Sequence, residues 1–372
     1  MIESIKNIID YMSAPTISFT LMTVLFPFIF PPTDWFDKVN RKLGINKLWT
    51  NTGGFILFSL VTGFFVLGYN DPNFKIILMK GDNFPIVLMI YSMFFFTWYA
   101  MKKSYINDAR IERGEKPTEY HDPEDKVLVW PDLVYIEFIA LILFMVFLIV
   151  WSILVAAPLE EPANPASTPN PSKAPWYFLG LQEMLVYFDP WLAGVVFPTL
   201  IILGMCAIPY MDINKKGDGY YSFKERRVGY FIFMYGWLVL WVYLIIIGTF
   251  FRGPNWNFFG PFEFWDPHKI VPLNNINLSE YFWVIGLAQP LPSNILLRES
   301  IGFIVTGLYL FVLPVVLAKT LLKNLFKAYG PTRYTFLMIL GLSMLSLPIK
   351  MYLRWIFNLK YIIGIPEWFF NI

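Results

Sequence analysis

Three adjacent aromatic residues, Trp176, Tyr177 and Phe178, follow directly on Pro175 and form the most promising site in the sequence. A polar segment with recurring proline, residues 159–175, leads into them, and the whole stretch separates two apolar runs of membrane-spanning length. Such a segment packs poorly inside a bilayer, where backbone polar groups find no water. We expect it to shape a binding site at the membrane surface. Aromatic residues also gather at interfaces simply as anchors, and that alternative stays open.

Two acids lie at the start of another apolar run. Glu137 is about one helical turn inside it, and Asp132 is at its boundary. An acid within a membrane span is a functional candidate by default. Both are also close enough to the boundary to reach water or pair with a lysine.

Several chemistries lack the residues they need. The only histidines, His121 and His268, fall in polar loops, so the chain cannot hold a haem between two histidines of facing helices. The single cysteine, Cys206, excludes an intrachain disulfide, and its apolar surroundings predict a small buried side chain. We find no zinc or nucleotide motif and predict no metal site. A net charge of only +2 gives no basis for nucleic-acid binding.

The composition predicts an integral membrane protein, because 56% of residues are hydrophobic and only 15% are charged. Isolated spans in lipid must be helices. We therefore predict an all-α membrane protein of about eight transmembrane helices. The apolar stretches of about 20 residues that could form them are 16–30, 53–69, 85–101, 133–157, 192–210, 229–251, 301–322 and 334–353.

The distribution of lysine and arginine predicts the orientation. Every second loop is basic, namely those between spans one and two, three and four, five and six, and seven and eight. The long loops 158–191 and 252–300 contain few positive charges. Because cytoplasmic loops are enriched in lysine and arginine, both termini and these two loops are predicted to be periplasmic.

Ordered motifs reveal a resemblance to a known family. They are Trp130-Pro131-Asp132-Leu133-Val134-Tyr135 at the start of a span, Glu161-Pro162-Ala163-Asn164-Pro165 and Thr168-Pro169 after it, and then Trp176-Tyr177-Phe178. In this order they resemble the C-terminal half of cytochrome b and, more closely, the separate subunit IV of split cytochrome b6f-type complexes. The resemblance covers residues 120–251 and three spans. Residues 252–372 look like an extension found in bacterial relatives, and residues 1–119 are a three-span extension of unknown role.

The resemblance implies part of a quinol-oxidation site. In the family, the loop after the first of these spans forms one wall of a pocket where quinol gives one electron to a Rieske iron–sulfur protein and one to haem b. Pro175, Trp176, Tyr177 and Phe178 would shape this cleft. The chain itself would carry no haem. Its implied partners are a haem-carrying cytochrome b N-terminal-type subunit, a Rieske protein and a c-type cytochrome, in a proton-translocating, dimeric complex of the bacterial inner membrane. Menaquinol is the quinol expected for such relatives.

One departure from the family pattern affects the mechanism. The common motif is Pro-Glu-Trp-Tyr, whose glutamate accepts a proton, but this chain has Ala174-Pro175-Trp176-Tyr177. Glu183, on what should be a short surface helix, is our candidate replacement, with Asp189 behind it. The alternative role for Glu183 is helix capping or a solvated face.

Two other acids acquire possible roles from the resemblance. The tail Pro366-Glu367-Trp368-Phe369 contains the Pro-Glu-Trp order that the motif itself lacks. We predict that this tail lies at the membrane interface and that Glu367 has a role at the site only if the tail folds back under the Trp176 loop. Glu137 would serve proton uptake to a quinone-reducing site on the other side.

Two other functional classes remain as alternatives. In the first, the altered motif means that the quinol-oxidation site has been lost, and the chain is a structural or docking subunit. The second is a transporter, which predicts buried charges and broken helices near mid-bilayer. The centres of the predicted spans show neither clearly.

Overall fold

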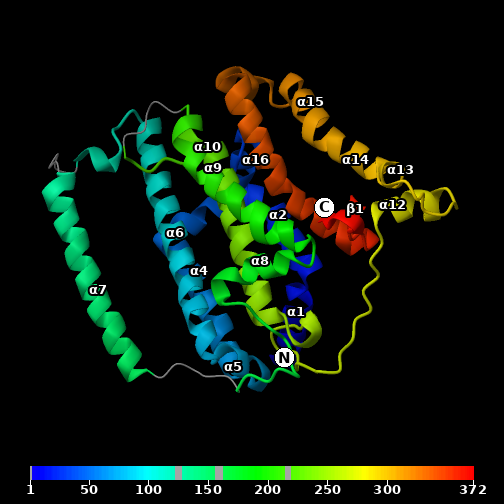
Figure 1. The fold of residues 1–372 in the computed structure, drawn as a ribbon. Helices are drawn as coiled ribbons and strands as arrows, with labels where there is room; N and C mark the ends of the chain where they lie inside the picture. Colours follow the sequence, from blue (N-terminus) through cyan, green and yellow to red (C-terminus); the bar gives the residue numbers. More distant parts are fainter. Residues whose placement is uncertain (1, 122–127, 156–161, 214–218) are drawn as a thin grey trace. The chain divides into compact units, whose positions relative to one another are not determined.

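The computed structural model describes residues 2–121, 128–155, 162–213 and 219–372. These residues form α-helices and one small two-stranded sheet, in which β1 and β2 pair antiparallel (Figure 1). The elements are α1 (Ile2–Ser13), α2 (Pro15–Ile29), α3 (Asp34–Leu43), α4 (Asn51–Tyr69), α5 (Pro72–Leu78), α6 (Phe84–Glu112), α7 (Val134–Leu154), α8 (Leu179–Met184), α9 (Phe197–Met211), α10 (Arg227–Met234), α11 (Tyr243–Ile246), α12 (Leu278–Glu280), α13 (Ile295–Arg298), α14 (Ser300–Gly307), α15 (Leu313–Lys319), α16 (Lys323–Phe357), β1 (Gly364–Ile365) and β2 (Phe370–Asn371).

The predicted membrane architecture is confirmed. Within the described residues, seven helical stretches are long and apolar enough to cross a membrane. The bent pair of α1 and α2 brings the number to eight if it counts as one span. Every apolar stretch predicted above overlaps one of the seven helical stretches or the bent pair. Helices are expected here, because in lipid each backbone polar group must be satisfied within its own helix. The seven are Asn51–Tyr69, Gly81–Glu112, Val129–Leu154, Leu192–Met211, Lys224–Phe251, Ser300–Lys319 and Lys323–Phe357.

The chain divides into two compact units. The first comprises residues 1–43, 170–217 and 228–372, and the second comprises residues 44–169 and 218–227. This division follows contacts in space, whereas the three segments predicted from the sequence (1–119, 120–251 and 252–372) follow family resemblance. That segment division stays a prediction.

The core of the first unit is aromatic and lies around α2. Phe19 is fully buried and contacts the rings of Tyr243, Tyr352 and Trp355 at centroid distances of 5.7 to 6.0 Å. Ser18 Oγ lies 2.7 Å from the Tyr243 hydroxyl, which supplies a polar tie between spans. Such tilted and edge-to-face contacts favour close packing of bulky rings. Thus α2 runs along two other spans and belongs to the core.

The second unit contains α4, α6 and α7. Gly54 of α4 faces Trp98 of α6 so closely that a Cβ atom would lie 2.5 Å from the indole ring, and Lys102 donates to Asn51 Oδ1 over 2.6 Å. In contrast, no residue of α7 is buried, and Glu137 in its first turn is exposed. α7 therefore has its apolar surface available to lipid or to another chain.

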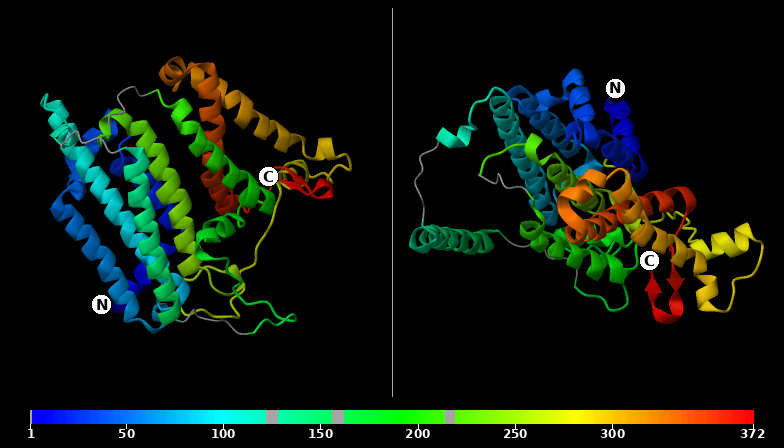
Figure 2. Two further views of the ribbon diagram at one scale, coloured as in Figure 1. Left: turned by 60° about the vertical axis from the view of Figure 1, so that its left-hand side comes forward. Right: turned by 90° about the horizontal axis from the view of Figure 1, so that it is seen from above.

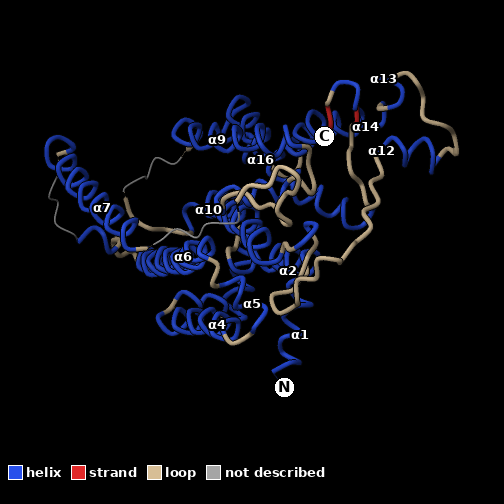
Figure 3. The backbone as a smooth tube through the Cα atoms, turned by 60° about the horizontal axis from the view of Figure 1, so that its bottom comes forward, coloured by secondary structure: helices blue, strands red, loops and turns tan. Residues whose placement is uncertain are grey.

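A long irregular segment follows the span that ends at Phe251. It runs to α12 and appears as tan tube in Figure 3. After α16, the chain ends in the β1–β2 hairpin (red arrows in Figure 2). Both segments belong to the first unit and contribute to the site described next.

Candidate functional site

The motif loop, defined here as residues 170–178, leads into α8. Pro175 precedes a short 3-10 turn, Trp176–Phe178, which continues directly into α8. Pro175 is the N-cap of this turn, and its carbonyl oxygen accepts a hydrogen bond from the Phe178 N–H at 2.8 Å. The turn leaves Tyr177 and Phe178 about half exposed, at 50% and 51% of their surface. Two of the three aromatic side chains predicted to shape a site, Tyr177 and Phe178, therefore point outward, while Trp176 is half-buried.

α8 lies closely against the span Lys224–Phe251. A Cβ atom on Gly180 would come within 3.2 Å of the Ile245 side chain, and one on Gly248 would come within 3.2 Å of the Leu179 carbonyl oxygen. Leu179, Gly180, Glu183 and Met184 are buried. Glycine on both sides allows this close approach, since an added Cβ atom at either position would require its neighbours to shift.

Side-chain hydrogen bonds hold the motif loop in shape. Gln182 Oε1 accepts a hydrogen bond from the Ala174 N–H at 2.8 Å, and Gln182 Nε2 donates to the Ser172 carbonyl at 2.9 Å. Asn170 Nδ2 donates to Asn255 Oδ1 at 2.9 Å, while the Asn255 N–H donates to Asn170 Oδ1 at 2.7 Å. These bonds connect the loop both to α8 and to the segment after Phe251.

Lys173 attaches the middle of the loop to the same segment. Its Nζ donates to the Thr249 carbonyl at 2.8 Å and lies 4.8 Å from the centroid of the Trp265 ring. A cation over an aromatic face is stabilised by the ring quadrupole. The motif loop and the segment 249–265 therefore form one structure in the first unit.

Glu183 is the charged centre of this structure. It is only 1% exposed, and its carboxylate accepts hydrogen bonds from Arg252 Nε at 2.9 Å and Arg252 Nη2 at 2.5 Å. Trp256 Nε1 donates a third bond, at 3.1 Å, and Arg252 Nη1 donates to the Trp256 carbonyl at 2.9 Å. Both carboxylate oxygens are thus engaged. A two-point arginine pair of this kind is geometrically specific and charge-assisted.

The electrostatics of the pair follow from its burial. Burial alone would lower the pKa of Arg252, but the adjacent Glu183 carboxylate outweighs it and raises the pKa above the ordinary value. Tyr187, one turn after Glu183, is almost fully buried, and that burial raises the pKa of its hydroxyl, assisted by the Glu183 charge. The guanidinium of Arg252 therefore stays charged and the hydroxyl of Tyr187 stays neutral at neutral pH.

The second acid named from the sequence, Asp189, has a different set of partners. Its Oδ2 accepts hydrogen bonds from the Tyr361 hydroxyl at 3.4 Å and from Asn371 Nδ2 at 3.0 Å. Trp191 Nε1 donates to the Asn371 carbonyl at 3.0 Å and its ring stacks on Phe370. The C-terminal hairpin therefore folds back onto the segment that follows α8.

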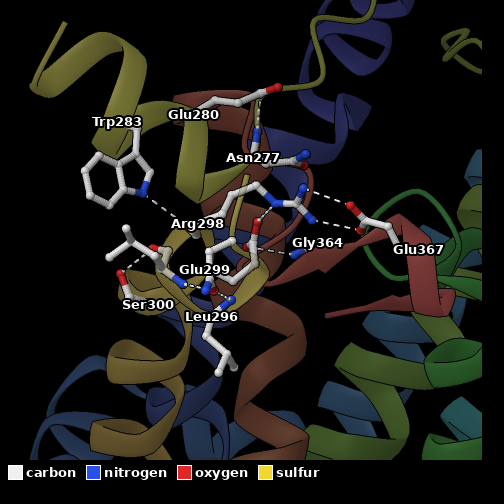
Figure 4. Close-up of polar contacts among 11 residues, drawn as sticks. Asn277, Glu280, Trp283, Leu296, Arg298, Glu299, Ser300, Gly364 and Glu367 are labelled. Carbon is white, nitrogen blue, oxygen red and sulfur yellow. Dashed lines mark hydrogen bonds and ion pairs between the residues drawn. The ribbon is translucent and has the colours of Figure 1, made fainter. Parts of the chain in front are cut away.

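Glu367 reaches a cluster of its own in this folded-back tail. Arg298 Nη1 and Nη2 donate to its two carboxylate oxygens at 2.9 and 2.8 Å, and Arg298 Nε donates to Glu299 at 3.2 Å (Figure 4). Glu299 in turn accepts from the Gly364 N–H at 3.0 Å. Arg298 holds the pKa of Glu367 down at about 2. Glu367 thus anchors the tail, and its described partner is Arg298 rather than a group of the motif loop.

Three other sequence expectations have structural outcomes. His268 is a surface residue, with its side chain 94% exposed, as predicted. Cys206 is exposed on α9, so the prediction that it is buried was wrong. Its stretch is apolar because it faces the membrane environment, and apolar sequence alone does not separate a lipid-facing from a buried position. Among the described residues, no group of three or more histidine, cysteine or acidic side chains is placed to hold a metal ion.

The residues that sequence reasoning missed are the partners of the loop. Arg252, Trp256, Gln182 and Lys173 hold the motif loop and Glu183 in place. Only Arg252 had a usable signal, as a charge directly after an apolar run. The early part of the proline-rich stretch, residues 156–161, lies outside the described residues.

Comparison with known families covers this same structure. Residues 162–261 match the family described as cytochrome b (C-terminal)/b6/petD. This part of the chain is therefore similar to the C-terminal domain of cytochrome b. The matched residues include the motif loop, α8, Arg252 and Trp256, and they end at Pro261. No solved structure matches the chain.

The domain places the chain in a broad functional class. The match relates residues 162–261 to a family of membrane cytochromes, in agreement with the apolar helices of the chain. The Trp130–Tyr135 motif, residues 1–119 and residues 262–372 lie outside the matched residues. The family match therefore supports the resemblance for the region around the motif loop and not for the rest of the chain.

Proposed function

We propose that this chain is a haem-free membrane subunit of a cytochrome bc-type quinol oxidoreductase and that its motif loop forms one wall of the quinol-oxidation site. The observation that carries the proposal is the outward position of Tyr177 and Phe178, within the residues that match the cytochrome b C-terminal family. A quinone ring needs an apolar, aromatic surface that is reachable from lipid. Pro175 and Trp176 complete this surface.

The redox centres belong to partner subunits in this proposal. The two histidines of the chain lie in loops, so a haem-carrying cytochrome b N-terminal-type subunit supplies haem b, and a Rieske protein supplies the iron–sulfur cluster. Electrons then reach a c-type cytochrome while protons are released on the periplasmic side. The complex is a dimer in the bacterial inner membrane, oxidises menaquinol, and has both termini of this chain in the periplasm.

Glu183 is the proposed proton acceptor. Support comes from its position on α8, directly after the aromatic turn, and from its contact with Arg252 and Trp256. To accept a proton, the carboxylate must release at least one of its arginine hydrogen bonds, because both oxygens are occupied. Quinol binding would have to favour the release of a hydrogen bond between Glu183 and Arg252. Once Glu183 is protonated, its neutral carboxyl group pairs less strongly with the Arg252 guanidinium.

The same ion pair favours a second candidate function. A carboxylate held at two points by a buried arginine is also a purely structural anchor, and in that case the chain is a non-catalytic docking subunit. The two functions differ in what Glu183→Gln does. Loss of a proton acceptor lowers turnover in an assembled complex, whereas loss of an anchor reduces assembly.

The first test uses the native complex purified in mild detergent. A redox difference spectrum and a quinol:cytochrome c assay, with and without a quinol-site inhibitor, are recorded on one sample. Co-purified b haem with inhibitor-sensitive turnover supports the quinol-site proposal. Haem without turnover supports the docking subunit, and absence of haem contradicts both.

A pair of variants then tests Glu183 itself. The single variant Glu183→Gln leaves Arg252 buried without its counter-charge, so it can fail for structural reasons alone. The double variant Glu183→Gln with Arg252→Gln removes both charges and serves as the matched control. If Glu183 accepts the proton, both variants lose turnover per haem relative to the unmodified chain. This loss is expected whether or not the variants also assemble less well. Full turnover per haem in the double variant across pH would remove Glu183 from the mechanism.

A further inference from the structure

The N-terminal helix α1 has its apolar face on the outside. Ile5, Ile8, Tyr11 and Met12 are exposed over 44%, 62%, 70% and 38% of their surface. Their spacing of three and four residues places them on one side of the helix. An amphipathic helix of a water-soluble protein shows the opposite arrangement, with its apolar side against the core.

Contacts within the first unit hold α1 in this orientation. Asp10 Oδ1 accepts a hydrogen bond from the Phe262 N–H at 2.8 Å, and a Cβ atom on Gly260 would come within 2.5 Å of the same oxygen. The Lys6 ammonium lies 5.7 Å from the centroid of the Phe262 ring, and its side chain is only 15% exposed. Lys6 and Asp10 therefore face the protein, and rotation of the helix would break these contacts.

The direction of α1 follows from its connection to α2. Only Ala14 separates the two helices, and their axes differ by 76°. α2 contains no charged residue over its 15 residues and packs along two membrane spans through Phe19 and Ser18. Because membrane helices are tilted from the bilayer normal by only about 20° on average, a bend of this size turns α1 toward the membrane plane.

We propose that α1 is an in-plane membrane helix whose apolar face, Ile5, Ile8, Tyr11 and Met12, inserts into the lipid at the membrane–water interface. The partner of this face is the bilayer, because α1 leads directly into the apolar helix α2 and exposes these four apolar side chains, while Lys6 and Asp10 contact the protein. Glu3, near the start of α1, is exposed on the other side of the helix. Helices that lie in the interface bury their apolar side about 5–10 Å into the headgroup and acyl boundary. Tyr11 suits this depth, since aromatic residues with a polar tip favour the interface.

The position of α1 has a consequence for the segment 260–262. Asp10 and Lys6 connect that segment to a helix at the membrane surface, and the neighbouring Phe259 contacts the ring of Trp265. Trp265 in turn lies under Lys173 of the motif loop. α1 thereby holds the outer support of the motif loop at a defined membrane depth. This inference does not depend on the quinol chemistry proposed above.

Spin labelling of the full-length chain tests the proposal. In a Cys206→Ser background, single cysteines replace Ile8 on the exposed apolar face and Glu3 on the other side of the helix. The labelled protein is reconstituted into vesicles of phosphatidylethanolamine and phosphatidylglycerol. Collisional relaxation by oxygen reports lipid exposure, and relaxation by a water-soluble nickel chelate reports water exposure. Labels at Ile202 of α9 and at exposed Asp266 calibrate lipid and water.

The proposal expects the oxygen-to-nickel ratio at position 8 to lie between those at positions 202 and 266, as suits the interface, and to exceed that at position 3 several-fold. Tyr11→Cys is a second reporter on the same face and should behave like position 8, which guards against misfolding of one variant. A ratio at positions 8 and 11 equal to that at Asp266 would show a helix in water and overturn the proposal. Protection from both reagents at positions 8 and 11 would also overturn it, because a protein partner would then cover the face.

Discussion

Glu183 and Arg252, which lie 69 positions apart in the sequence, form a buried two-point ion pair that joins the helix after the motif loop to the end of a membrane span. Only 1% of the Glu183 side chain and 11% of the Arg252 side chain reach the surface. The pair places a negative charge directly behind the aromatic turn and fixes its distance from the span. The pair therefore ties α8 to the end of that span.

Removal of one member of this pair should destabilise the protein strongly. Arg252→Gln leaves a buried carboxylate without its counter-charge, and we expect the free energy of unfolding to fall by about 3 kcal/mol or more. The double variant Glu183→Gln with Arg252→Gln should recover much of that loss. Thermal unfolding in detergent measures both. Arg113→Gln, which removes a solvent-exposed pair with Glu115, is the control and should have no measurable effect. Equal destabilisation by Arg252→Gln and Arg113→Gln would contradict the assigned role.

The C-terminal tail should depend on pH through Glu367. Arg298 lowers the pKa of Glu367 from its ordinary 4.5 to about 2. A carboxyl group with a depressed pKa contributes stability that is fully present above its unfolded-state pKa and is lost as the pH falls through the folded-state value. Docking of the tail should therefore weaken between about pH 4.5 and pH 2.

Hydrogen exchange measures this docking. The amides of Ile362 and Ile372 donate to backbone carbonyls across the hairpin and should stay protected from exchange at neutral pH. Arg298→Gln should expose them already at neutral pH, while Lys80→Gln, which removes an exposed pair with Asp82, should leave them unchanged. Unaltered protection of both amides in Arg298→Gln would show that the ion pair does not hold the tail.

Gln182 should control the shape of the motif loop. Its amide makes two hydrogen bonds to the loop, and each such bond is worth about 1 kcal/mol. In an assembled complex, Gln182→Ala should raise the KM for quinol roughly tenfold, because part of the binding free energy would be spent on ordering the loop. Gln182→Glu retains the acceptor for the Ala174 N–H but loses the donor, so its effect should be smaller. An unchanged KM in Gln182→Ala would separate the loop from quinol binding.

Close packing of α8 on its span should be sensitive to a single methyl group. Gly248→Ala places a Cβ atom 3.2 Å from the Leu179 carbonyl oxygen, and we expect a loss of about 1 kcal/mol in the free energy of unfolding. The matched control is Gly194→Ala, where nothing lies within 4 Å of the added atom. Thermal unfolding of the two variants should differ. The same melting temperature for both would mean that α8 is not held tightly against the span.

The sequence predicted the spans well because their signal is local. A helix in lipid needs about 20 consecutive apolar residues, and that requirement can be read without knowledge of any neighbour. The first stretch, 16–30, was short and ended by Pro31 and Pro32, yet α2 proved to be part of the core. Its burial depends on Phe19 meeting rings more than 200 residues away, which no local pattern reveals.

The site was predictable only in part for the same reason. Pro175 and the aromatic turn could be recognised as a local sequence motif. The pairing of Arg252 with Glu183 and the contact of the tail with Asp189 join residues far apart in the sequence, and no local pattern predicts them. Cys206 was misjudged because lipid-facing and buried positions have the same apolar composition in a membrane protein. Charges near the ends of spans, such as Arg252 and Arg298, were the most informative residues that the sequence analysis did not use.

Photoaffinity labelling of the purified complex with an azido-substituted quinol tests the central claim most directly. If the motif loop forms a wall of the quinol-oxidation site, peptide mapping should find the adduct within residues 173–185, on or near Tyr177 and Phe178, and excess quinol or a quinol-site inhibitor should remove it. An adduct confined to other subunits, or labelling of this loop that quinol does not compete away, would contradict the account.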